Sequence, residues 1–87
     1  MQWQKLSNVN PPPNQILMVY GKGYKDKSFV IFARRFTNEE GEDAIEHSDD
    51  YETLAHNPIE CWEDSFEAFK EMSPNAYWCV FHEPEGN

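Results

Sequence analysis

The chain has 87 residues, of which 7 are Lys or Arg and 16 are Asp or Glu, so its formal net charge is −9. This length suits one small domain, placed at residues 1–87, and the 15% aromatic residues supply enough bulk for one hydrophobic core. No apolar run has the length of a membrane span, and the N-terminal residues lack the pattern of a signal peptide, so we expect a cytoplasmic protein without membrane contact.

The N-terminal part predicts a β-hairpin. Residues 3–9 lead into Pro11-Pro12-Pro13, a triplet that forces extended backbone and cannot continue a helix. Residues 15–20 are apolar and rich in strand formers, and residues 28–36 form a second such run. The polar segment between them contains two glycines, which indicates the turn of a hairpin.

Residues 37–50 predict an acidic loop. Seven of these fourteen residues are Asp or Glu, and Ile45 is the only large apolar side chain. Such a composition is typical of a solvated segment outside the sheet. The next six residues, 51–56, fit either a short strand or one helical turn.

Residues 58–72 predict the single helix. Asn57 is suited to the N-cap, Pro58 to the first helical position, and Pro74 ends the segment. Apolar residues recur at steps of three and four, as one face of a helix requires. They are Ile59, Trp62, Phe66, Phe69 and Met72. Alternatively, residues 59–62 could form a strand, with the helix starting at Asp64.

The last apolar run, residues 76–81, predicts a third strand, and residues 82–87 form a polar tail. The element order β-β-α-β indicates an α+β fold, a small, mainly antiparallel three-stranded sheet with one helix packed on a face. We expect Phe66, Phe69 and Trp78 in the core. Tyr24 and Tyr51, flanked by charges, are expected to be exposed.

Charge is segregated along the chain. Residues 1–36 carry six cations and one acid, a net charge of +5, whereas residues 37–87 carry fifteen acids and one lysine, a net charge of −14. A net negative chain repels phosphate backbones, so we expect a protein partner with a basic surface and no direct nucleic-acid binding. The predicted partner-binding residues are Glu39, Glu40, Glu42, Asp43, Asp49, Asp50, Glu63 and Glu67.

Histidines and cysteines offer a second interpretation. His56, Cys61, Cys79 and His82 have the chemistry of a small metal- or thiol-dependent site, but their spacing matches no common zinc motif. We therefore expect no metal, no cofactor and no enzyme activity. Both cysteines are expected to be reduced core side chains, and a disulfide would require export.

Both ends of the chain carry family-like motifs. Trp3, the proline triplet and the strand at residues 16–20 form the first, and Trp78, Glu83 and Pro84 belong to the second. Together they resemble a family of small domains of unknown function found in bacteriophages and prophages. The chain departs from the family pattern at three positions, Tyr77, Val80 and His82. The resemblance implies a phage origin, a similar sheet and a host bacterial cytosol, and it carries no catalytic residue.

These observations favour a non-enzymatic inhibitor, a monomer or weak dimer, that occupies a basic nucleic-acid-binding surface of a host defence protein. In size and charge the chain resembles anti-CRISPR and anti-restriction proteins. A third interpretation reverses the polarity, with a basic surface meeting an acidic partner or nucleic acid. Its residues are Lys22, Lys25, Lys27, Arg34 and Arg35.

Overall fold

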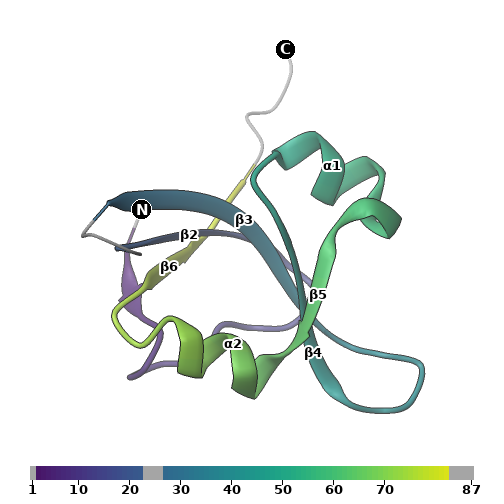
Figure 1. Ribbon diagram of the computed structural model, residues 1–87, viewed down its shortest axis with the longest axis horizontal. Coiled ribbons are helices and arrows are strands. Elements are labelled where there is room, and N and C mark those ends of the chain that lie inside the picture. Colours follow the sequence, from purple (N-terminus) through teal and green to yellow (C-terminus); the bar gives the residue numbers. More distant parts are fainter. Residues whose placement is uncertain (1, 23–26, 83–87) are drawn as a thin grey trace.

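The computed structural model describes residues 2–22 and 27–82, which form one six-stranded sheet and two short helices (Figure 1). The strand order is β1-β6-β2-β3-β4-β5, and all five described pairings are antiparallel. The strands are β1 (Gln4–Lys5), β2 (Ile16–Lys22), β3 (Ser28–Thr37), β4 (Asp43–Ser48), β5 (Trp62–Ser65) and β6 (Tyr77–Val80). The helices are α1 (Tyr51–His56) and α2 (Phe66–Met72), and Pro58–Glu60 is a short 3-10 helix, η2. Neither α1 nor α2 has the length and apolar character needed to span a bilayer.

The fold class expected from the sequence is wrong. The protein is mostly β, with six strands and two helices rather than three strands and one helix. The predicted strands at residues 15–20, 28–36 and 76–81 are confirmed as β2, β3 and β6, and β2 pairs with β3 as the predicted hairpin. Its turn, residues 23–26, lies outside the described residues.

The prediction of an acidic loop at residues 37–50 is corrected by β4, which pairs with β3 along its whole length. Two acids of β4 pair with arginines of β3, Glu46 directly across from Arg34 and Asp43 diagonally from Arg35. Arg34 Nη2 donates to Glu46 Oε2 at 3.0 Å, and Arg35 Nη2 donates to Asp43 Oδ2 at 2.7 Å. An acid-rich segment becomes a strand here because the neighbouring strand supplies its counter-charges.

The predicted helix at residues 58–72 is also wrong in extent. The segment divides into η2, β5 and α2. The alternative prediction, a strand followed by a shorter helix, is closer to this arrangement, although β5 begins later than residue 59, where that alternative started the strand. Ser65 sets the start of α2, because its Oγ accepts a hydrogen bond from the Ala68 backbone N–H at 3.1 Å. Ile59, Trp62 and Met72 are exposed, so the apolar periodicity does not mark one buried helix face.

The main core lies between one face of the sheet and α2. Phe66 and Phe69 of α2 and Trp78 of β6 are buried there, as predicted. Leu17 and Val19 of β2 complete the centre of this layer. The Phe69 ring lies 5.3 Å from the His47 ring, which places α2 across β4.

The opposite face carries a smaller cluster under α1. Rings of Phe32, Tyr51 and Phe81 lie 5.1–5.6 Å apart, and Leu54 of α1 is fully buried. The expectation that Tyr51 is exposed is therefore wrong, since it packs on the sheet. Tyr24 lies outside the described residues.

The N-terminal segment is fixed to the sheet by strand pairing and side-chain contacts. β1 pairs with β6, and the Trp78 indole N–H donates to the Val9 carbonyl oxygen at 2.8 Å. Arg35 donates to the Pro11 carbonyl oxygen at 2.9 Å. The chain before the hairpin therefore forms part of the domain.

The turn between β3 and β4 is ordered by Asn38. Its side-chain oxygen accepts hydrogen bonds from the backbone N–H groups of Glu40 and Glu42 at 3.0 and 2.9 Å. Gly41 has φ +80°, a conformation that side chains disfavour. The turn thus holds a defined conformation while projecting acidic side chains outward.

Substituting Gly41 tests this turn. Gly41→Ala should lower the free energy of unfolding by about 1 kcal/mol, because a Cβ fits the open space but not the positive φ. Gly41→Asn should recover part of the loss, since Asn tolerates this conformation. Urea unfolding followed by circular dichroism measures both, and equal losses for the two variants would contradict a left-handed Gly41.

Candidate functional site

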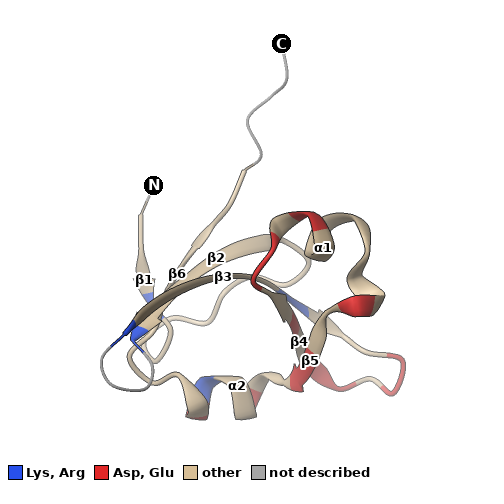
Figure 2. Ribbon diagram, turned by 45° about the horizontal axis from the view of Figure 1, so that its top comes forward, with Lys and Arg blue, Asp and Glu red and all other residues tan. Residues whose placement is uncertain are grey.

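Charge is separated across the sheet (Figure 2). Asp and Glu gather on α1, on β4, β5 and the turn between β3 and β4, whereas Lys gathers at the opposite part of the sheet, near β1 and the ends of β2 and β3. Arg34 and Arg35 of β3 lie beside the acids of β4, and Lys70 lies on α2. Five carboxylates from the turn, β5 and α2 are called the acidic end below. They are Glu39, Glu40, Glu42, Glu63 and Glu67.

Two adjoining hollows bring the acidic end together. The first, of about 400 Å³, is lined by Glu42, Glu63 and Glu67, and the second, of about 310 Å³, by Glu39, Glu40 and Glu63. Both also include Asn38, the residue that orders the turn. Residues far apart in sequence therefore present one concave negative surface, and no carboxylate of the acidic end forms an ion pair with another described residue.

The other three predicted site residues are placed differently. Asp43 lines the first hollow, but it forms two hydrogen bonds with Arg35, and this contact lowers its pKa. Asp50 caps α1 by accepting from the Thr53 N–H and hydroxyl at 3.1 and 2.8 Å, and these bonds lower its pKa. Asp49 is exposed at the far end of β4, next to α1. Asp49 and Asp50 therefore lie apart from the acidic end, and the side chains of Asp43 and Asp50 stabilise the fold.

The histidines and cysteines singled out in the sequence are not brought together. Cys79 is buried in β6, Cys61 is half-buried just before β5, and both are free thiols. Burial raises both thiol pKa values, which lowers the thiolate fraction at neutral pH. His56 lies 3.5 Å from Glu52, and His82 is exposed after β6. Within residues 2–22 and 27–82, no three potential ligands are close enough to share a metal ion.

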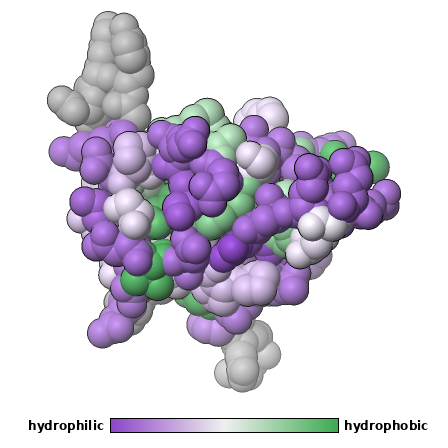
Figure 3. Space-filling view, turned by 90° about the horizontal axis from the view of Figure 1, so that it is seen from below, coloured by the Kyte–Doolittle hydropathy of each residue, from purple (hydrophilic) through white to green (hydrophobic). Residues whose placement is uncertain are grey.

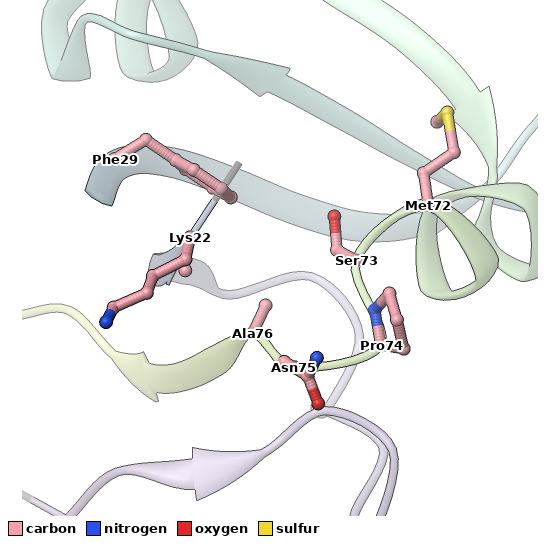
Figure 4. Close-up of a pocket in the computed structure, with 8 residues that line it drawn as sticks. Lys22, Phe29, Met72, Ser73, Pro74, Asn75 and Ala76 are labelled. Carbon is pink, nitrogen blue, oxygen red and sulfur yellow. The ribbon is translucent and has the colours of Figure 1, made fainter. Parts of the chain in front are cut away.

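A separate hollow of about 180 Å³ lies between the end of the β2–β3 hairpin and the turn that links α2 to β6 (Figure 4). Phe29 and Lys22 line one side, and Ser73, Pro74 and Ala76 line the other. Among the residues that the structure describes, its lining contains no His, Cys, Asp or Glu.

An aromatic surface that the sequence reasoning missed lies on the same face of the sheet as α1, beyond the part that α1 covers. Trp3, Tyr20 and Tyr77 line a shallow groove of about 400 Å³. Their exposed fractions are 42%, 37% and 40%, high for such large side chains. The Trp3 and Tyr20 rings meet edge to face at 6.3 Å. No local pattern pointed to this surface, because its residues become neighbours only through the pairing of β1 and β2 with β6.

The structure supports only part of the third interpretation, a basic surface. Arg34 and Arg35 form ion pairs with Glu46 and Asp43, so their charges are already neutralised within the sheet. Lys22 and Lys27 are exposed near the end of the hairpin, and Lys25 lies outside the described residues.

No protein-family model matches this chain, and no curated protein or solved structure is significantly similar to it. The resemblance to small phage and prophage domains therefore stays a prediction.

Proposed function

We propose that this is a non-enzymatic, phage-derived protein that acts in the bacterial cytosol by binding a host protein. Its acidic end occupies a basic surface on which that host protein binds nucleic acid, and so inhibits it. The observation that carries the proposal is the convergence of the five carboxylates of the acidic end on two adjoining hollows.

The rigidity of the elements that carry the acidic end supports this proposal. The turn bearing Glu39 and Glu40 is closed by the Asn38 hydrogen bonds, Glu63 lies on a paired strand, and Glu67 lies on a capped helix. A surface held in its binding conformation loses little conformational entropy when it meets a partner. Concentrated negative charge also steers association with a basic surface and rejects acidic ones.

The surface chemistry on the α2 side fits the same proposal. The face seen in Figure 3 is mostly hydrophilic, with hydrophobic side chains confined to smaller patches. A polar, charged contact that excludes little apolar surface depends strongly on ionic strength. The expected complex is therefore sensitive to salt.

Charge reversal tests the proposed function. The variant Glu39→Lys, Glu40→Lys, Glu63→Lys should lose about 100-fold or more in affinity for the partner, because attraction becomes repulsion at the contact. Its thermal unfolding should be nearly unchanged, since none of the three side chains forms an ion pair with a described residue. The partner is identified by capture from bacterial lysate at low salt and release at about 0.5 M salt, where the Debye length is only a few ångströms.

A matched variant controls for total charge. Glu52→Lys, Glu60→Lys, Glu71→Lys changes three exposed acids outside the acidic end and shifts the net charge from −9 to −3, as the first variant does. Only the first variant should lose the partner. The captured host protein should bind nucleic acid, and the wild-type acidic protein should displace that nucleic acid. Equal loss in both variants, or a partner that keeps its nucleic acid, would contradict the proposal.

A further inference from the structure

We propose that the aromatic surface at the basic part of the sheet binds single-stranded nucleic acid, with nucleobases stacking on Trp3, Tyr20 and Tyr77 and phosphates meeting the neighbouring lysines. This binding site is separate from the acidic end and does not depend on the proposed function. It is built from strands that are adjacent in the sheet but distant in sequence.

Strand register places the side chains in one row. Lys5 of β1 lies opposite Tyr77 of β6, Tyr77 lies opposite Tyr20 of β2, and Tyr20 lies opposite Val30 of β3. Side chains directly opposite one another in a sheet project from the same face. The row therefore crosses four strands on one face, and Trp3 packs against Tyr20 beside it.

α1 leaves this part of the face open. Its main contacts with the sheet are to β3 and β4, where Phe32 and Tyr51 pack together. Met18 pairs with Phe32, and Tyr20 lies two residues further along β2. The aromatic surface therefore lies on the same face of the sheet as the ring cluster under α1. α1 thus covers one end of the face, while the rings of Trp3, Tyr20 and Tyr77 remain accessible at the other.

Local charge complements a phosphate backbone. Lys5 lies in the row itself, Lys22 follows Tyr20 by two residues on the same face, and Lys27 precedes β3. Glu63 of the acidic end lies on β5, three strand positions from Tyr20 on β2, roughly 14 Å along the sheet at the usual strand spacing. The turn with Glu39, Glu40 and Glu42 follows the end of β3, more than seven residues from Val30, the partner of Tyr20, and so roughly 23 Å away along the strand. The Debye length at physiological salt is about 8 Å. The net charge of −9 therefore does not govern binding at this surface.

Nucleic acid fits better than a second copy of the chain. Three rings exposed to about 40% offer on the order of 250 Å² of apolar area, well below the roughly 800 Å² per partner of a standard protein interface. Stacked bases need only flat aromatic faces and nearby cations. The aromatic and basic side chains are what such a ligand requires.

Fluorescence anisotropy of labelled dT12 and U12 with the full chain, at about 0.1 M NaCl, tests the proposal. Binding of either strand should be at least about 5-fold tighter than binding of a 12-base-pair duplex, whose bases cannot stack on the rings. Trp3→Ala and Tyr77→Ala should each weaken binding about 5- to 100-fold. The slope of log K against log salt should be about −2, as for three phosphate contacts on a single strand.

Matched variants separate this binding from general effects. Trp62→Ala removes another exposed tryptophan, and Lys70→Gln removes a lysine on α2, so neither should weaken binding, whereas Lys22→Gln should. The charge-reversal variant of the acidic end should bind at least as well as wild type, and thermal melts should show that all variants fold. Absence of strand binding, equal affinity for duplex, or indifference to Trp3→Ala would overturn the proposal. A wild-type dimer that Trp3→Ala dissociates, with no strand bound, would instead identify an interface between copies.

Discussion

Replacing Phe66 with Ala should lower the free energy of unfolding by about 3–5 kcal/mol, which is the usual loss when a buried phenylalanine leaves a cavity. Phe66 is 1% exposed and joins α2 to the main core. A domain of this size has a total stability of roughly 5–10 kcal/mol, so the variant should lose about half of its stability and unfold at a markedly lower temperature. Urea unfolding followed by circular dichroism measures the loss.

Met72 provides the matched control for Phe66 on the same helix. It is 65% exposed, so Met72→Ala should change the free energy of unfolding by less than about 0.5 kcal/mol. A loss below about 1 kcal/mol for Phe66→Ala, or similar losses at the two positions, would show that α2 does not pack on the sheet through Phe66.

Replacing Arg35 with Met should lower the free energy of unfolding by about 2–3 kcal/mol, since charge-assisted hydrogen bonds and a buried acceptor are lost together. The guanidinium donates to both Asp43 carboxylate oxygens and to the Pro11 carbonyl, and it lies 4.1 Å from the centre of the Phe66 ring. Arg35 therefore joins the N-terminal segment, β4 and α2. Arg34→Met is the matched control, with a smaller expected loss of about 1 kcal/mol, because Glu46 is the one acceptor of Arg34 within residues 2–22 and 27–82.

The dependence of stability on pH gives a second measurement for the Arg35 variant. The hydrogen bond from Arg35 lowers the pKa of Asp43 from its ordinary 3.8, so below that value the unfolded chain binds a proton that the folded protein does not. This contribution is complete above about pH 5 and disappears as pH falls through the lowered pKa. Arg35→Met should remove it, giving a shallower loss of stability below pH 4, and an unchanged acid profile would contradict the ion pair.

Asp50 contributes to the same acid sensitivity, because bonds from Thr53 lower its pKa in the folded protein. Its contribution should persist in Arg35→Met, since the two carboxylates have different partners. Part of the acid sensitivity that remains in this variant should therefore come from the cap of α1.

The candidate sites differ in how much of each the sequence could reveal. Charge segregation was sufficient to find the acidic segment. It could not show that Asp43 and Asp50 stabilise the fold, whereas Glu39 and Glu40 form no ion pair with a described residue. The aromatic surface was hidden, because Trp3, Tyr20 and Tyr77 become neighbours only when β1 and β2 pair with β6. Position in a sheet depends on strand order, which local patterns do not encode.

The sequence by itself determined the elements whose apolar runs are continuous. β2, β3 and β6 and the core positions of Phe66, Phe69 and Trp78 follow from side-chain bulk and strand preference, which are local properties. Only the tertiary structure decided that β4 and β5 are strands and that the helix begins at Phe66. The acids of β4 form a strand because Arg34 and Arg35 of the neighbouring strand bind Glu46 and Asp43. The segment from Pro58 to Met72 divides because β5 pairs with β4. Those energies come from partners distant in sequence, and they outweigh local propensity.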